Sequence, residues 1–143
     1  GFPMGGMIAF GEKLAALFTP GSHGSTFAGN PLGAAAGLAT LDVIEDENLV
    51  ANAEARGEQL RDGIMATGNP LFVSVRGRGL LDAVELKHPC SHAVMNYCLE
   101  HGLIVNAVAP NALRFAPPLI VTAQDVDQAL AILKDVPTDL PDD

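Results

Sequence analysis

Residues 22–31 read Ser22-His23-Gly24-Ser25-Thr26-Phe27-Ala28-Gly29-Asn30-Pro31. The glycines let the backbone approach a ligand closely, and the two hydroxyls between them can bind phosphate or carboxylate oxygens. Asn30 followed by Pro31 is typical of a helix N-cap and its first helical residue. This pattern predicts an anion-contacting loop that leads into a helix. The alternative from the same residues is a plain surface turn before a capped helix.

The apolar pattern on both sides of this loop predicts alternating helices and strands. Expected helices cover residues 12–18, 31–47, 49–67, 91–101 and 122–133. Expected strands cover residues 7–10, 71–76, 80–86, 103–105 and 113–115. The third helix should start with Asn48 as its N-cap, and its apolar stripe is Leu49, Ala53, Gly57, Leu60 and Ile64. The order indicates an α/β or α+β fold, with one small sheet covered by helices on one face.

The length of 143 residues suits one domain or a piece of a larger one. We predict a leading part at residues 1–46 and a compact α/β domain at 47–136. The remaining residues, 137–143, form an acidic, proline-bearing tail that we expect to be frayed.

Composition excludes several classes of function. The net charge is −9 and the eight basic residues are scattered, so we expect neither nucleic acid nor an anionic membrane as a partner. The two cysteines, Cys90 and Cys98, match no CxxC or disulfide-dense pattern, which favours a cytoplasmic location. His88, Cys90 and His92 are close in sequence, but Pro89 intervenes and no fourth ligand is apparent, so we expect no metal site.

Arg114 lies between Leu113 and Phe115 in an apolar segment, where its charge must find an anion or reach water. Its guanidinium can bind a carboxylate through two parallel hydrogen bonds. Two interpretations stay open: a structural ion pair with one of the 17 acidic residues, or the binding of a ligand carboxylate. We interpret His23 as a loop hydrogen-bonder. Gly77 and Gly79 serve a hairpin turn and not a phosphate loop, because no helix follows them.

Four segments, in this order, resemble class-III (ornithine/acetylornithine-type) aminotransferases, which use pyridoxal 5′-phosphate. They are G-x-P-M-G at residues 1–5, H-G-S-T-F-x-G-N-P at 23–31, V-R-G-x-G-L at 75–80 and L-R-F-A-P-P-L at 113–119. Ala28 stands where the family more often has glycine. The resemblance implies the C-terminal part of a fold type I transferase. Residues 1–46 would be the end of its large cofactor-binding domain and a connecting helix, and 47–136 its small C-terminal domain.

The resemblance also implies roles for three residues. Thr26 would bind the cofactor phosphate from across a homodimer interface, Ser25 would contact the substrate, and Arg114 would meet a substrate carboxylate. The family's Schiff-base lysine precedes the glycine run that Gly1 continues, so it would lie upstream of this chain. The chain's own lysines fall on predicted helix surfaces and in a polar turn; they are Lys13, Lys87 and Lys134. We therefore expect no catalytic residue in this chain, and no activity from it alone.

The implied parent enzyme moves an amino group from N2-acetylornithine to 2-oxoglutarate, forming glutamate, in arginine biosynthesis. An alternative within the family is an ornithine or other ω-amino-acid aminotransferase. Residues 30–38 also resemble glutamate-1-semialdehyde aminomutases, in which we would not expect the segment around Arg114. A further alternative is a binding or dimerisation module without chemistry.

Overall fold

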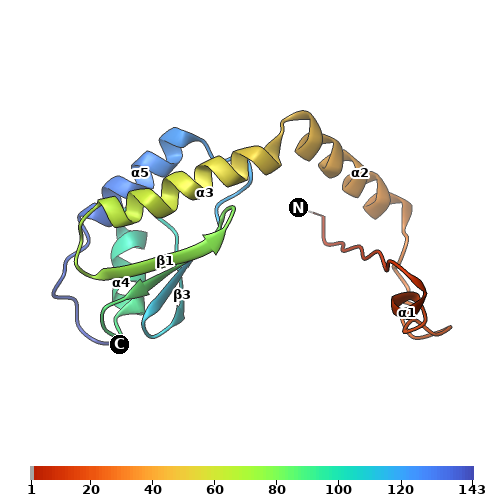
Figure 1. Ribbon diagram of the computed structural model, residues 1–143, viewed down its shortest axis with the longest axis horizontal. Helices are drawn as coiled ribbons and strands as arrows, with labels where there is room; N and C mark the ends of the chain where they lie inside the picture. The colour runs from red at the N-terminus through yellow and green to blue at the C-terminus, as the bar shows by residue number, and fades with distance from the viewer. Residues whose placement is uncertain (1) are drawn as a thin grey trace. The chain divides into compact units, whose positions relative to one another are not determined.

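The computed structural model describes residues 2–143, which divide into one compact unit ending at Glu47 and another beginning at Asn48. The first unit contains α1 (Glu12–Ala15) and α2 (Pro31–Asp46), shown in Figure 1. The strand predicted at residues 7–10 is absent, and the backbone there is irregular. A strand needs a hydrogen-bonded neighbour, and this segment has none among the described residues. The helix predicted at 12–18 ends early, because none of its side chains is buried.

Asn30 joins the loop to α2 through both ends of its amide. Its Oδ1 accepts a hydrogen bond from the Gly33 backbone N–H at 2.6 Å, and its Nδ2 donates to the Phe27 carbonyl at 2.9 Å. Pro31 occupies the first helical position. The predicted cap and helix are therefore confirmed, and the cap fixes how the loop enters the helix.

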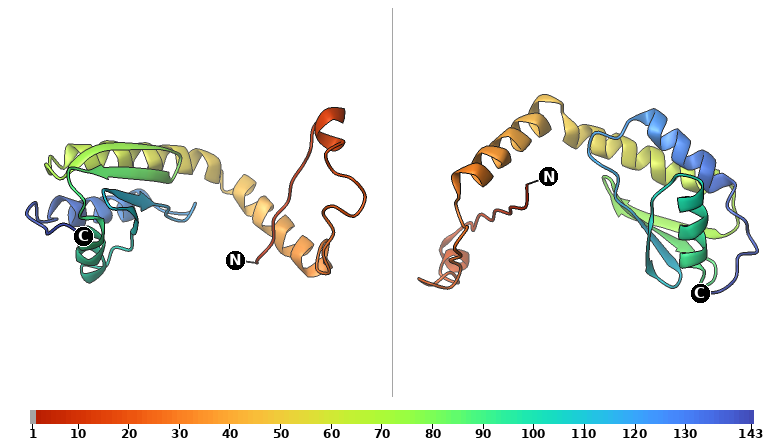
Figure 2. Two further views of the ribbon diagram at one scale, coloured as in Figure 1. Left: turned by 90° about the horizontal axis from the view of Figure 1, so that it is seen from below. Right: turned by 180° about the vertical axis from the view of Figure 1, so that it is seen from behind.

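The second unit is a four-stranded antiparallel sheet with three helices. Its strands are β1 (Phe72–Arg78), β2 (Leu81–Leu86), β3 (Asn106–Ala109) and β4 (Ala112–Phe115), in the order β1-β2-β4-β3. The helices are α3 (Leu49–Ala66), α4 (Ser91–Glu100) and α5 (Ala123–Lys134). Helices α3 and α5 lie side by side, and α4 packs on β3 and β4 (Figures 1 and 2). The predicted strand at 103–105 is wrong, because pairing with β4 begins only at Asn106.

One face of the sheet forms the hydrophobic core, as predicted. Val84 and Leu113 point into this core and are at most 1% exposed. They join one apolar cluster with residues from all three helices, including Ile64, Val94 and Leu133. The side chains that alternate with them along the strands are half-buried or exposed. The opposite face of the sheet is therefore uncovered in this unit.

Helix α3 begins where predicted, but by a different mechanism. Asn48 adopts a left-handed conformation with φ of 51°, and its side chain makes no capping hydrogen bond. Asparagine tolerates this left-handed conformation better than most residues. The predicted buried stripe is confirmed at Leu49, Gly57, Leu60 and Ile64.

Helix α3 approaches the β1–β2 turn closely at Gly57. A β-carbon added to Gly57 would overlap the carbonyl oxygen of Gly79, so only glycine permits this contact. Four residues further along α3, Arg61 Nη1 donates to the same carbonyl at 3.0 Å and to Asp82 Oδ1 at 2.9 Å. The Asp82 side chain is fully buried, and that of Arg61 is 23% exposed. An ion pair thus joins α3 to the hairpin.

The prediction of a frayed acidic tail is wrong. The tail is hydrogen-bonded to the start of α4. The carboxylate of Asp143 accepts hydrogen bonds from Ser91 Oγ and the backbone N–H of His92, each at 3.0 Å. The Asp143 N–H donates to the Pro89 carbonyl at 2.7 Å. Cys90 holds the N-cap position of α4 without a side-chain hydrogen bond. Asp143 supplies the acceptor that this helix end lacks, which is the physical reason for the difference.

The sequence Thr122-Ala123-Gln124-Asp125 resembles a capping box with aspartate in place of glutamate, and the structure confirms this prediction at the start of α5. Thr122 Oγ1 accepts from the Asp125 N–H at 3.2 Å, and the Thr122 N–H donates to Asp125 Oδ2 at 2.9 Å. The Thr122 hydroxyl, which donates to Asp125 Oδ2 at 2.6 Å, lowers the pKa of the Asp125 carboxyl, and the hydrogen bond from the Thr122 backbone N–H lowers it further. Asp125 is therefore ionised and already engaged in its own helix end.

Candidate functional site

The glycine-bounded loop lines a pocket of about 330 Å³ within the first unit. Ser25, Ala28 and Asn30 contribute from the loop, and Pro3 and Met4 from the start of the chain. Thr26 is exposed and does not line this pocket, and its hydroxyl makes no hydrogen bond within residues 2–143. The two adjacent hydroxyls thus have different surroundings.

Hydrogen bonds hold the part of the loop that precedes these hydroxyls. Ser22 Oγ donates to the Thr19 carbonyl at 2.7 Å and lies 3.0 Å from His23 Nδ1. The His23 ring packs edge-on against Phe18, with ring centroids 5.3 Å apart. The interpretation of His23 as a loop hydrogen-bonder is therefore confirmed.

The loop offers one hydroxyl that could donate to an anion such as the phosphate of pyridoxal 5′-phosphate. The hydroxyl of Thr26 is exposed and unengaged among the described residues, and hydroxyls donate readily to phosphate oxygens. No acidic residue occurs in the sequence between Glu12 and Asp42, so the loop carries no nearby charge that would repel an anion. The lysines at 13, 87 and 134 are exposed, and none lines the pocket of Ser25 or that of Arg114.

Arg114 belongs to a row of side chains that crosses all four strands. In the sheet register, Ala83 pairs with Arg76 on one side and with Arg114 on the other, and Arg114 pairs with Asn106. All four lie on the uncovered face, because the neighbouring residues Val84 and Leu113 face the core. The strand pairing therefore fixes Arg114 on the open side of the sheet.

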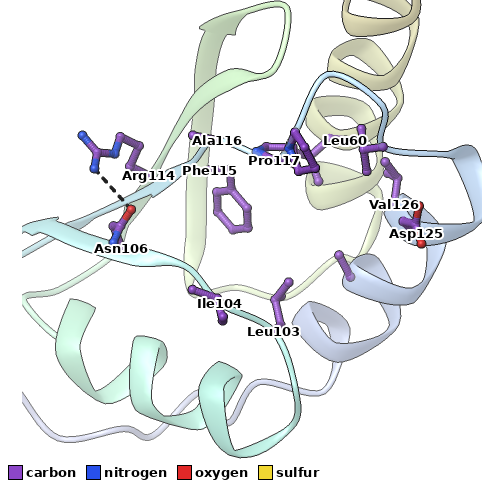
Figure 3. Close-up of a pocket in the computed structure, with 13 residues that line it drawn as sticks. Leu60, Leu103, Ile104, Asn106, Arg114, Phe115, Ala116, Pro117, Asp125 and Val126 are labelled. Atoms are coloured by element: carbon purple, nitrogen blue, oxygen red, sulfur yellow. Dashed lines mark hydrogen bonds between the residues drawn. The ribbon is translucent and has the colours of Figure 1, made fainter. Parts of the chain in front are cut away.

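The guanidinium of Arg114 has a neutral partner. Its Nη2 donates to Asn106 Oδ1 at 3.2 Å (Figure 3). Within residues 2–143 no carboxylate lies at ion-pair distance from it; the ion pairs found there are Arg61–Asp82, His88–Asp142 and His92–Asp143. Of the two interpretations open from the sequence, the structural ion pair is not what this chain forms.

Arg114 stands at one end of an apolar pocket of about 380 Å³ in the second unit. Figure 3 shows Arg114 and Asn106 on one side, Asp125 on the other, and the Phe115 ring and Leu103 between them. The site therefore combines a cation at its edge with an apolar interior, an arrangement suited to a small ligand that carries a carboxylate. Sequence reasoning missed Asn106, since only the strand register places it opposite Arg114.

His88 and His92 lie against different acidic residues, and Cys90 is a buried free thiol. His88 Nδ1 lies 2.7 Å from Asp142, and His92 Nδ1 lies 3.0 Å from Asp143. Burial and the nearby Asp143 and Asp142 charges raise the pKa of the Cys90 thiol. In the described part of the chain, no group of three or more His, Cys, Asp or Glu side chains is placed to hold a metal ion. Among residues 2–143, no helix has the length and apolar character required to cross a membrane.

Comparison with known proteins identifies relatives over nearly the whole chain. The sequence profile described as "Aminotransferase class-III" matches residues 1–136. The acetylornithine aminotransferase of Gloeobacter violaceus is 43% identical over 144 residues, covering 99% of this chain and 36% of the relative. That of Mycobacterium bovis is 47% identical over 133 residues, covering 93% of this chain and 33% of the relative. The chain thus spans about a third of the length of these relatives.

Solved structures give the same result. The acetylornithine aminotransferase from Elizabethkingia anophelis matches with a TM-score of 0.74 at 38% identity, over 85% of this chain and 33% of that one. The ornithine aminotransferase from Toxoplasma gondii matches with a TM-score of 0.74 at 34% identity, over 86% of this chain and 30% of that one. The resemblance and the fold class inferred from the sequence are confirmed.

Proposed function

The chain belongs to the class-III aminotransferases, and we propose on that premise that it is the C-terminal part of a pyridoxal-phosphate enzyme that transfers an amino group from N2-acetylornithine to 2-oxoglutarate. Relatives named acetylornithine aminotransferase, at 43–47% identity, support this choice of donor over ornithine, whose aminotransferase matches at 34%. Glutamate would be the second product, and the pathway arginine biosynthesis.

The observation that carries the proposal is the exposed Arg114 with its neutral partner. Acetylornithine, 2-oxoglutarate and glutamate all carry a carboxylate that a guanidinium can hold through two hydrogen bonds. Arg114 is exposed on the open face of the sheet, so a substrate carboxylate could reach the guanidinium directly. Arg114 would thus bind and orient the substrate.

In the first unit, the loop residues Thr26 and Ser25 would contact the cofactor and the substrate. We assign Thr26 to the cofactor phosphate in the partner subunit of a homodimer, and Ser25 to substrate contact. When bound, pyridoxal phosphate supplies the electron sink for amino transfer. In this proposal residues 1–46 end the large domain, residues 47–136 form the small domain, and the cofactor-bearing lysine lies upstream of Gly1. The cytoplasmic location stays a prediction.

Arg114→Lys in the full-length enzyme tests the role of Arg114. Lysine keeps the positive charge but cannot make two parallel hydrogen bonds to one carboxylate. Catalytic efficiency should therefore fall about 10²-fold, or roughly 3 kcal/mol of transition-state binding, while the melting temperature changes little. Arg76→Lys is the matched control, because Arg76 lies in the same row of the same face. A sharp fall in melting temperature, with turnover per folded molecule preserved, would make Arg114 a structural residue.

The 143-residue chain itself should be inactive, because its lysines are exposed and line neither the pocket of Ser25 nor that of Arg114. Incubation with pyridoxal phosphate should give neither the absorbance of a lysine adduct nor turnover of acetylornithine. Turnover above background would contradict this part of the proposal. If the full-length enzyme is also inactive towards every ω-amino donor tested, the binding or dimerisation module is the better description.

A further inference from the structure

We propose that residues 137–143 form a strap that Asp143 latches to the start of α4, and that opening of this strap alone gives reagents access to the buried Cys90 thiol. The inference concerns the second unit and does not depend on the substrate proposed above. Figures 1 and 2 show the C-terminal segment returning from the end of α5 to the start of α4. The reactivity of Cys90 would then report whether the strap is closed.

The strap is anchored where it leaves α5. Asn69 Nδ2 donates to the Val136 carbonyl at 2.8 Å, and both residues are buried. Further along, Leu140 is half-buried and packs against the hydrophobic core. Residues 138, 139 and 141 are exposed. The middle of the strap is therefore loosely packed, and its position depends on how the outer end is held.

The first turn of α4 holds the outer end. The Asp143 carboxylate accepts hydrogen bonds from Ser91 Oγ and the His92 N–H, each at 3.0 Å, and from the Ala93 N–H at 3.3 Å. The backbone donors lie at a helix start, where a negative charge is favoured. The Asp143 side chain is 16% exposed, so water can replace it at these donors. Release of Asp143 should therefore cost much less than unfolding of the domain.

Cys90 lies beneath this latch. The Asp143 N–H donates to the Pro89 carbonyl at 2.7 Å, and its carboxylate accepts from Ser91 Oγ. Asp143 thus contacts the residues on both sides of Cys90 in the chain. Cys90 itself is a free thiol and is fully buried. The closed strap therefore restricts the approach of a reagent to its sulfur.

The carboxylates of the latch also disfavour the reactive form of this thiol. The thiolate, and not the thiol, is the nucleophile. Burial raises the pKa of Cys90, and the charges of Asp143 and Asp142 raise it further. Asp142 is held there by His88, whose Nδ1 lies 2.7 Å from Asp142 Oδ1. Opening of the strap would therefore expose Cys90 and remove both charges from its surroundings.

Cys98 is a buried thiol on the same helix that serves as an internal reference. It is also free and fully buried in the hydrophobic core. Burial alone raises its pKa to about 11, without a contribution from the strap. Exposure of Cys98 should therefore require the core to open, whereas exposure of Cys90 requires only the strap to be released.

The test follows the reaction of N-ethylmaleimide with the 143-residue chain, whose two cysteines are Cys90 and Cys98. The thiolate sulfur adds to one alkene carbon of the reagent, and a proton from solvent adds to the other. Tandem mass spectrometry assigns the label to each thiol at a series of urea concentrations below the unfolding transition. Without urea, Cys90 should react about tenfold faster than Cys98 or more. Its rate should also depend less on urea, because opening of the strap exposes less surface than unfolding.

Asp143→Asn tests the latch. It replaces charge-assisted hydrogen bonds by neutral ones, so labelling of Cys90 should accelerate roughly 3- to 30-fold while that of Cys98 is unchanged. Asp142→Asn, which loses the ion pair with His88, should accelerate Cys90 in the same direction. Asp139→Asn is the matched control, because Asp139 is exposed in the same strap outside the latch, and it should change neither rate.

Two results would overturn the inference. Equal rates and equal urea dependence for Cys90 and Cys98 would mean that both thiols become accessible only by unfolding. Acceleration of both thiols by the same factor in Asp143→Asn would show a loss of global stability and no strap. Circular dichroism checks that each variant is folded. If the 143-residue chain is not folded by itself, the same labelling is measured in the full-length enzyme, where peptide masses distinguish these thiols from any others.

Discussion

Arg61 Nη1 lies 2.9 Å from Asp82 Oδ1, and the other carboxylate oxygen, Oδ2, is buried without a hydrogen-bond partner within residues 2–143. Burial raises the pKa of Asp82, and the hydrogen bond and charge of Arg61 oppose that rise only in part. A buried charge with one unsatisfied oxygen destabilises the fold unless its partner is present. The ion pair with Arg61 therefore contributes to holding the β1–β2 hairpin against α3.

Replacing Arg61 with methionine should destabilise the chain by about 3 kcal/mol, because it leaves Asp82 buried without a counter-charge. Urea unfolding measures this directly. Arg56→Met is the control, since Arg56 lies on the same helix but hydrogen-bonds only to Gln59. Equal losses for the two variants would show that the lost arginine stem, and not the ion pair, sets the effect.

The pH dependence of Asp82 has a defined sign. Its folded pKa lies above the ordinary value of 3.8, so its contribution to stability is fully present below pH 3.8 and is lost as pH rises through the folded pKa. The free energy of unfolding of the native chain, relative to that of Asp82→Asn, should therefore decrease as pH rises from about 3 towards neutrality. Urea titrations at a series of pH values measure the difference. A difference that increases with pH would contradict the assignment.

Asp143 should show the opposite behaviour. Although burial opposes it, hydrogen bonds from His92, Ser91 and Ala93 lower the pKa of this carboxyl to about 2. Its stabilisation is therefore present above pH 3.8 and is lost as pH falls towards 2. Asp143→Asn should reduce amide-exchange protection in the first turn of α4 at neutral pH, and this difference should vanish in acid. Asp139→Asn, in the same exposed tail, should change neither, and an equal effect of both variants would remove Asp143 from this role.

Thr26→Ala should weaken cofactor retention in the full-length enzyme by about 1–3 kcal/mol, the worth of one charge-assisted hydrogen bond to a phosphate. Equilibrium dialysis of pyridoxal phosphate measures the change. Ser22→Ala is the control, because Ser22 lies in the same loop but hydrogen-bonds to Thr19 and His23. Unchanged affinity in Thr26→Ala would exclude Thr26 from the phosphate site.

Local chemistry made several features predictable from the sequence. The caps at Asn30 and Thr122 and the buried stripe of α3 depend on residues close in the chain, and all formed as expected. Features that depend on residues far apart in the chain were not predictable in this way. The tail is held by the start of α4, and the pairing of the edge strand with β4 starts at Asn106, opposite Arg114. Neither pairing has a local signal, and the apolar residues 7–10 looked like a strand although no neighbour pairs with them in the described structure.

The strand register that forms the row across the sheet also ties the hydrophobic core to the position of Arg114. The row consists of Arg76, Ala83, Arg114 and Asn106. Successive residues of a strand face opposite sides, so a slip of β4 by one residue would carry Arg114 into the interior and Leu113 out to solvent. A misregistered molecule would lose its core and the exposed position of Arg114 in the same step. If Arg114 binds carboxylates as proposed, that binding should therefore report correct alignment of β4 in the sheet.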